Sequence, residues 1–176
     1  MEAAQPVPEM APQVGSLSTA MNIKWDEKAS ASANARRRLP ELASKYFAEV
    51  RKALARKPTP AQMHRVRLAS KRLRYTLELF KPCYAGGLER RLGELKKLQD
   101  ILGALNDAVS AAGLVEKALS PKPPERARVL AFLEQRAAEK TEEFRQHWKS
   151  DFDAPGKESW WVTYLARNAR APAKGK

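Results

Sequence analysis

The stretch that decides the fold lies at residues 61–82 and reads AQMHRVRLASKRLRYTLELFKP. At 100° per residue, its apolar side chains fall within about one third of the circumference of a helix. This apolar face consists of Val66, Ala69, Leu73, Leu77 and Phe80. Thr59 supplies a side-chain oxygen suited to an N-cap, and Pro60 suits the first helical position. The pattern predicts an amphipathic helix over residues 61–81 that packs on a core.

A second line of side chains runs along another face of the same helix. Its members follow spacings of three, four, three and four residues: His64, Arg67, Lys71, Arg74 and Glu78. They would line up over about four turns, or ~21 Å of helix axis. Like charges one turn apart repel by a few tenths of a kcal/mol per pair, and Glu78 relieves only one end. Such a row becomes favourable when phosphates lie along it, because guanidinium groups bind phosphate oxygens in bidentate fashion.

Proline and glycine clusters divide the rest of the chain into helix-favouring intervals rich in Ala, Leu, Glu, Lys and Arg. We expect helices over about 26–56, 61–81, 86–118 and 124–150. The third carries an apolar stripe of Leu88, Leu92, Leu95, Leu98, Leu102 and Leu105. The fourth carries a similar stripe of Val129, Leu130, Leu133, Ala137 and Phe144. No segment alternates with period two for long enough to predict a sheet, so the fold class is all-α, an antiparallel four-helix bundle.

The same sequence pattern divides the chain into three regions. Residues 1–22 contain several prolines and little to bury, which predicts a disordered tail. Residues 23–150 form the helical domain. Residues 151–176 form a basic, aromatic tail whose Trp160 and Trp161 either pack on the domain, the interpretation we favour, or contact a granule or lipid surface.

Composition points to an anionic partner. The 176 residues include 33 Lys and Arg against 20 Asp and Glu, a formal net charge of +13. Such an excess opposes compaction by self-repulsion, so nucleic acid, polyphosphate and an anionic membrane surface are all candidates. Cys83 is the single cysteine, which excludes an internal disulfide and a cysteine-based zinc site. The sequence has no apolar run long enough to span a bilayer, and its N-terminus does not resemble a secretory signal peptide. We therefore expect a cytoplasmic protein.

The sequence contains none of the common catalytic motifs considered below. It has no glycine-rich phosphate loop, no nucleophile elbow and no supported Cys–His pair. Asp100 and Asp107 lie on one face of the third helix and could hold Mg²⁺, although pairing with neighbouring cations is the commoner role. We therefore expect a protein that is not an enzyme and that has neither a cofactor nor a metal.

The string HRVRLASKRLRYTLELFKP at residues 64–82 resembles the signature of the CHAD family, the conserved-histidine α-helical domains. The string LKKLQDILGALNDAV at residues 95–109 resembles that family's next helix, and the resemblance covers about residues 30–150. It implies a helical bundle that binds inorganic polyphosphate through a basic surface. The family's functional positions carry over to His64, Arg67, Lys71 and Arg74, with Arg72 secondary because of its helical angle. We add Lys96 and Lys97, and the basic residues Arg37, Lys45, Arg51 and Arg91 would widen the surface.

The resemblance also shows a departure. Full-length CHAD members resemble two copies of a four-helix unit, each with its own His-and-Arg helix. This sequence carries the signature once, and its residues resemble those of the second copy. The chain is therefore either a half domain that rebuilds the whole as a homodimer, which we favour, or a shortened form with a weaker site.

Three functions remain open at this point. Non-enzymatic polyphosphate binding leads, with a possible setting on polyphosphate or storage granules. A nucleic-acid-binding protein is the alternative that charge alone would support, although no base-reading motif is recognisable. An accessory scaffold on storage granules, anchored by the tail, is the third.

Overall fold

The computed structural model describes residues 24–84, 86–120 and 124–170. They form five α-helices: α1 (Ala31–Leu54), α2 (Pro60–Leu79), α3 (Gly87–Ala118), α4 (Pro124–His147) and α5 (Lys157–Asn168). A 3-10 turn at Lys81–Cys83 follows α2, and a π-helical turn at Trp148–Phe152 follows α4. These three ranges contain no strand, so the predicted all-α fold is confirmed. The tail predicted at residues 1–22 lies outside them.

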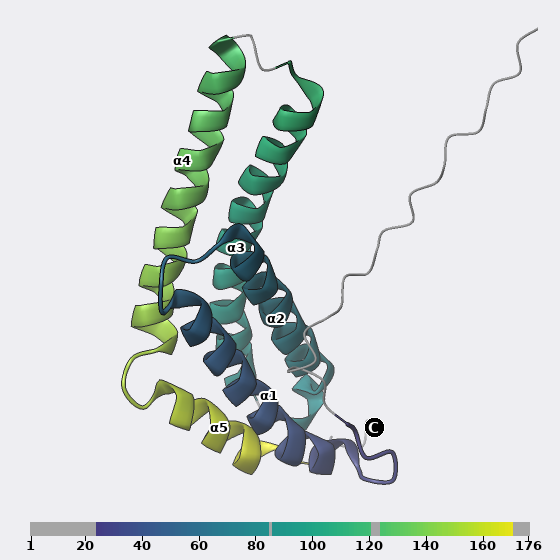
Figure 1. Cartoon of the computed structure of the whole chain (residues 1–176). Coiled ribbons are helices and arrows are strands. Elements are labelled where there is room, and N and C mark those ends of the chain that lie inside the picture. The colour runs from purple at the N-terminus through teal and green to yellow at the C-terminus, as the bar shows by residue number, and fades with distance from the viewer. Residues whose placement is uncertain (1–23, 85, 121–123, 171–176) are drawn as a thin grey trace, which may run out of the picture.

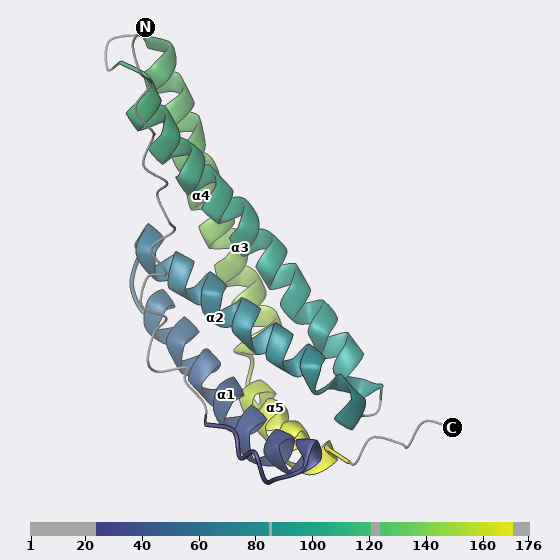
Figure 2. The same cartoon turned by 90° about the vertical axis from the view of Figure 1, so that its right-hand side faces the viewer.

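The first four helices pack on one another in sequence order, and the last helix returns to the first. α1 contacts α2, α2 contacts α3, and α3 contacts α4 (Figures 1 and 2). α5 crosses back and packs on α1. α3 and α4 continue beyond the ends of α1 and α2 as a two-helix projection (Figure 2). We call this projection the arm; it consists of the C-terminal part of α3 and the N-terminal part of α4.

Helix α2 begins as the sequence predicts. The Thr59 side chain accepts a hydrogen bond from the Gln62 backbone N–H, and the Gln62 side chain accepts one from the Thr59 N–H, while Pro60 occupies the first position. This reciprocal cap satisfies two amide groups that a helix start otherwise leaves unpaired. The predicted face is buried at Val66, Ala69, Leu73 and Leu77, and Phe80 is half-buried.

Two polar contacts hold α2 against its neighbours. The hydroxyls of Ser70 and Tyr46 share a buried hydrogen bond of 2.9 Å, which links α2 to α1. Gln99 Nε2 donates to the Ser70 carbonyl at 2.8 Å, which links α3 to α2. Burial raises the pKa of Tyr46, so the phenol stays neutral and keeps this bond. Because buried polar groups are costly to leave unpaired, these contacts fix the rotation of α2 about its axis.

The core centres on an aromatic cluster at the junction of α1, the π-helical turn and α5. Trp148 packs on Phe47 with ring centroids 5.2 Å apart and on Phe152 at 5.5 Å. Trp161 extends the cluster from α5 and stacks on Phe152 at 6.1 Å. Trp161 is 1% exposed and Trp160 38%. The favoured interpretation, in which these tryptophans pack on the domain, is confirmed for Trp161.

Polar contacts also tie α5 to the start of the fold. Arg51 of α1 pairs with Asp153, at 2.6 Å, and with Glu158. Arg36 donates to the Ala169 carbonyl at 2.7 Å, and the Tyr84 hydroxyl donates to the Leu165 carbonyl at 2.8 Å. At Gly87 a Cβ atom would lie 2.8 Å from the Tyr164 hydroxyl oxygen, so a larger residue there would displace the Tyr164 ring from the first turn of α3.

The two predicted apolar stripes have different outcomes. On α3 all six leucines are buried except the half-buried Leu92, as expected. On α4 only Phe144 is buried, and Val129 is exposed. The expectation that the bundle covers the α4 stripe is therefore wrong for Val129, because α1 and α2 do not extend along the arm, whereas Leu130, Leu133 and Ala137 are half-buried.

Replacing Trp161 with alanine tests the role of α5 in the core. Deleting a fully buried tryptophan leaves a cavity and should lower the free energy of unfolding by about 3–5 kcal/mol, measured by urea denaturation. Trp160→Ala is the matched control and should cost less than half as much, since that ring is partly exposed. Equal costs for the two variants would contradict the assignment of Trp161 to the core.

Candidate anion-binding surface

The predicted row on α2 lies along the outer surface of the fold. His64 is exposed, and Arg67, Lys71 and Arg74 are half-buried. The buried positions Ser70 and Leu73 alternate with them and hold the helix on the core. Long basic side chains in this position lay their methylene stems on the protein and present their charged heads to solvent. The structure therefore brings these four predicted residues together on one side of one helix.

The middle of this row is not neutralised by carboxylates. Within the described ranges, neither Arg67 nor Lys71 forms an ion pair. Arg74 is closest to an acid, with its Nε 3.6 Å from Glu78 Oε1, and its side chain is 18% exposed. Some cations elsewhere lie closer to a carboxylate, as in the Lys45–Glu41 and Lys81–Glu89 pairs, both at 2.7 Å. The row thus has two adjacent positive charges, one turn apart, with no carboxylate partner among the residues that the structure describes.

An aromatic ring sits beside the same cations. The Arg74 guanidinium lies 4.9 Å from the centre of the Tyr75 ring, and Lys71 Nζ lies 6.0 Å from it. Tyr75 itself is exposed. The electron-rich ring face attracts both cations and limits their range of motion without neutralising them.

At the other end of the row, His64 is oriented by α3. His64 Nδ1 lies 2.9 Å from Asn106 Oδ1, and Asn106 Nδ2 donates to Ser110 Oγ at 3.5 Å. An amide oxygen can only accept, so Nδ1 of the imidazole donates and Nε2 is left to face an incoming group. His64 and Asn106 also border a hollow of about 350 Å³, lined mainly by apolar side chains such as Met63 and Leu105.

The position of α3 separates two lysines that the sequence places together. Gln99 and Asn106 contact α2 and so define the side of α3 that faces the row. At 100° per residue, Lys96 lies about 60° from Gln99 around the helix, and Lys97 about 160° from it. Lys96 therefore borders the row, where it also pairs with Asp100 at 3.4 Å. Lys97 points to the opposite side of α3.

The remaining predicted cations lie outside the row. Arg72 is half-buried and, being one residue from Lys71, lies about 100° around the helix from it. The cations proposed to widen the surface are each paired with an acid: Arg37 with Asp26, Lys45 with Glu41, Arg51 with Asp153 and Glu158, and Arg91 with Glu94. They add less free positive charge than their number suggests.

Asn106 and Gln99 contact α2 beside the row, and sequence reasoning missed both. Both lie in the string at residues 95–109, where they are polar residues set among the leucines of an apolar stripe. Polar side chains in such places normally have a buried or half-buried partner. That signal would have marked them, but not which residue of α2 each one contacts.

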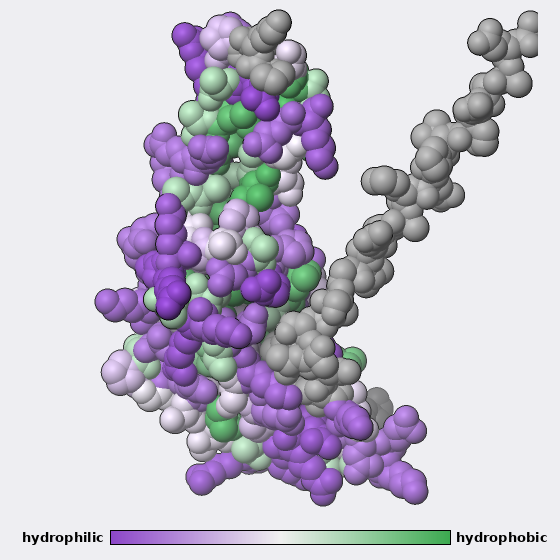
Figure 3. Space-filling model, in the orientation of Figure 1, coloured by the Kyte–Doolittle hydropathy of each residue, from purple (hydrophilic) through white to green (hydrophobic). Residues whose placement is uncertain are grey.

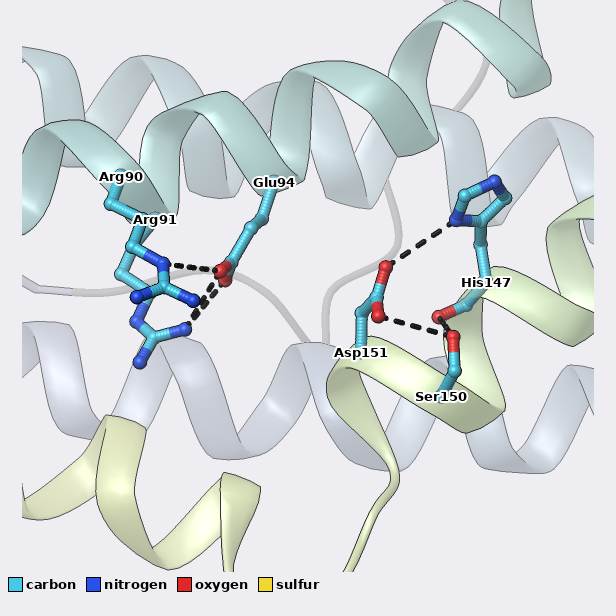
Figure 4. A network of polar contacts seen from close by, with 6 residues as sticks. All are labelled: Arg90, Arg91, Glu94, His147, Ser150 and Asp151. Carbon is cyan, nitrogen blue, oxygen red and sulfur yellow. Dashed lines mark hydrogen bonds and ion pairs between the residues drawn. The ribbon is translucent and has the colours of Figure 1, made fainter.

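A group of catalytic residue types elsewhere in the fold does not have catalytic geometry. In Figure 4, His147 Nδ1 lies 3.4 Å from Asp151 Oδ2. Ser150 donates to Asp151 Oδ1 at 3.1 Å rather than to the imidazole. The histidine therefore does not contact the serine hydroxyl that it would have to deprotonate. The second network in Figure 4 is an ion-pair cluster in which Arg90 and Arg91 both contact Glu94.

The described residues offer no metal site and no reactive thiol. Residues 24–84, 86–120 and 124–170 contain no group of three His, Cys, Asp or Glu side chains suited to a metal ion. Cys83 is buried, and desolvation raises the pKa of its thiol, which disfavours the nucleophilic thiolate. None of the helices described is both long enough and apolar enough to cross a membrane.

Comparison with known proteins gives one match. The family model described as "CHAD domain" matches residues 12–116, a span that contains α1, α2 and nearly all of α3. No curated protein and no solved structure matches the chain. The matched span covers more than half of the 176 residues and includes the whole row on α2 together with Lys96 and Asn106. This chain therefore belongs to the CHAD family.

Proposed function

We propose that this protein binds inorganic polyphosphate, without catalysis, along the row on α2. The observation that carries the proposal is the pair Arg67 and Lys71, which lie one turn apart with no carboxylate partner within the described ranges. CHAD domains are associated with polyphosphate binding, and the row lies within the span that matches the family model.

The shape of the surface suits a linear anion. The cations are spaced by ~6 Å from Arg67 to Lys71 and ~4.5 Å from Lys71 to Arg74 along the helix axis. From His64 to Arg74 the row extends ~15 Å, so several phosphate groups of one chain would lie beside it. The repulsion between neighbouring cations would be relieved when the anion binds.

Each residue has a distinct role in this proposal. Arg67 and Arg74 donate paired hydrogen bonds to phosphate oxygens, and Lys71 supplies a compact charge between them. His64 Nε2 contacts an oxygen when it carries a proton, with the ring held by Asn106. Lys96 extends the surface onto α3. Arg72 does not contact the anion and contributes only long-range electrostatic attraction. We further propose a cytoplasmic setting, including polyphosphate granules, where the bundle would serve as a scaffold.

Nucleic-acid binding is the second candidate, and Tyr75 is the observation that favours it. An exposed ring beside two cations can stack a base of a single strand. A single ring offers one such stacking position, whereas the cations form a continuous row, so we rank polyphosphate first.

Charge reversal of the row is the main test. The variant Arg67→Glu, Lys71→Glu, Arg74→Glu should bind long-chain polyphosphate about 100-fold more weakly or worse, because three charge-assisted contacts are lost. Binding is measured by titration calorimetry at fixed salt, and helicity by circular dichroism. The matched control, Lys52→Glu, Lys117→Glu, Lys149→Glu, changes net charge equally at exposed sites away from the row and should stay within about fivefold of the parent.

If both triple variants lost the same amount of polyphosphate affinity, the loss would be an effect of net charge alone, and the assignment of the site to the row would be wrong. Competition decides between the ligands. At equal phosphate concentration, single-stranded RNA should displace little bound polyphosphate. Efficient displacement that disappears in Tyr75→Ala would support the nucleic-acid alternative instead.

The two adjacent lysines of α3 give a finer test of the same surface. Lys96→Glu should weaken polyphosphate binding about 5- to 20-fold, since it replaces an attraction at the border of the row with a repulsion. Lys97→Glu should change binding less than threefold, although both variants alter net charge identically. The affinities are compared at two salt concentrations, and a stronger effect of Lys97→Glu would contradict the position assigned to Lys96.

A further inference from the structure

The arm exposes large apolar side chains that the domain does not cover. On α4, Phe132 is 62% exposed and Val129 41% exposed, and Leu114 and Leu119 are exposed near the end of α3. In Figure 3, hydrophobic residues are visible on the arm between purple, hydrophilic ones. Exposed apolar groups clustered on a projecting element mark interaction sites more often than isolated ones do.

Four residues of α4 form one line along the exposed side of this helix. Glu125, Val129, Phe132 and Arg136 follow spacings of four, three and four residues, so they share one stripe of the helix. All four are exposed, and neither Glu125 nor Arg136 has an ion-pair partner in the part of the chain that the structure describes. The stripe therefore carries two apolar residues between two opposite charges that have no ion-pair partner among the described residues.

The stripe is complementary to itself. The apolar pair Val129 and Phe132 and the charged pair Glu125 and Arg136 are both centred between Leu130 and Ala131. If a second α4 lies antiparallel across a twofold axis at that centre, Val129 meets the partner's Phe132 and Glu125 meets the partner's Arg136. Each contact then occurs twice, as a twofold interface requires.

We propose that the arm is a homodimerisation surface, formed by antiparallel packing of α4 on α4 of a second copy. The four-three-four spacing is that of antiparallel coiled coils, in which the two kinds of seam position face each other. The central contacts bury the exposed apolar side chains, and the flanking ion pairs set the register and the antiparallel direction. The arm is short, so the contact is at the low end of specific interfaces and the dimer dissociates on dilution.

This inference goes beyond polyphosphate binding and does not depend on it. A dimer would nevertheless carry two α2 rows in one particle. A long polyanion that reaches both rows would bind the second one intramolecularly and so more tightly overall.

Charge exchange across the twofold axis provides a direct test. The variants Glu125→Arg and Arg136→Glu each place like charges opposite one another twice, and each should raise the dimer dissociation constant about tenfold or more. The double variant Glu125→Arg, Arg136→Glu should restore it. An equimolar mixture of the two single variants should form a heterodimer, because every charged contact is then between opposite charges. Sedimentation equilibrium over a concentration series measures these constants without added polyanion.

Two further variants separate the arm from a general effect of exposed apolar groups. Phe132→Ser should weaken the dimer strongly, whereas Leu79→Ser, which removes an exposed leucine from the end of α2, should not. Circular dichroism checks that each variant keeps its helicity. A chain that stays monomeric at all concentrations, or a dimer that neither single charge variant weakens and the double variant does not restore, would overturn the proposal. Both results would leave the polyphosphate-binding proposal standing, because the charge-reversal variants of the row on α2 test it separately.

Discussion

The rotation of α2 about its own axis determines where the four side chains of its basic row point. Ser70 lies at the contact between α1 and α3, where its hydroxyl meets Tyr46 and its carbonyl accepts a hydrogen bond from Gln99. A shift of the helix by one residue would turn its surface by 100° and carry Lys71 into the core in place of Ser70. The free-energy cost of burying an unpaired ammonium group is far larger than the stabilisation from contacts between helices. Only one rotation of α2 about its axis is therefore available. The basic row is therefore held outward by the packing on its opposite face.

This arrangement separates the stability of the helix from its charge. Repulsion between neighbouring cations costs a few tenths of a kcal/mol per pair. Full burial of a leucine contributes about 1.5–3 kcal/mol, and α2 buries both Leu73 and Leu77. The fold can thus keep Arg67 and Lys71 without a carboxylate partner among the described residues and remain stable. Because the side chains are already aligned in the free protein, an anion that binds there finds much of the ordering cost already met.

Local periodicity was enough to predict α2, its cap, its buried face and its row, since all of these depend on residues within a few turns of one another. Local periodicity could not predict how the helices pack on one another. Lys96 and Lys97 entered the predicted surface together because a sequence does not say which side of α3 faces α2. Gln99 and Asn106 received no role for the same reason. The α4 stripe was expected to be covered, since its spacing does not reveal that α1 and α2 end short of the arm. Trp161 could be assigned to packing in general, but its contact with Phe152 requires α5 to turn back onto α1.

The return of α5 to α1 also changes how the chain must fold. In a simple up-and-down bundle each helix pairs with its neighbour in sequence, and contacts stay local. Here Arg51 meets Asp153 and Arg36 meets the carbonyl of Ala169, so groups more than a hundred residues apart must come together before the core closes. Closing so long a loop has an entropic cost, and topologies rich in distant contacts fold more slowly than local ones of equal stability. The first helix therefore reaches its final environment only when the fifth is in place, which makes the two ends of the domain one cooperative folding unit.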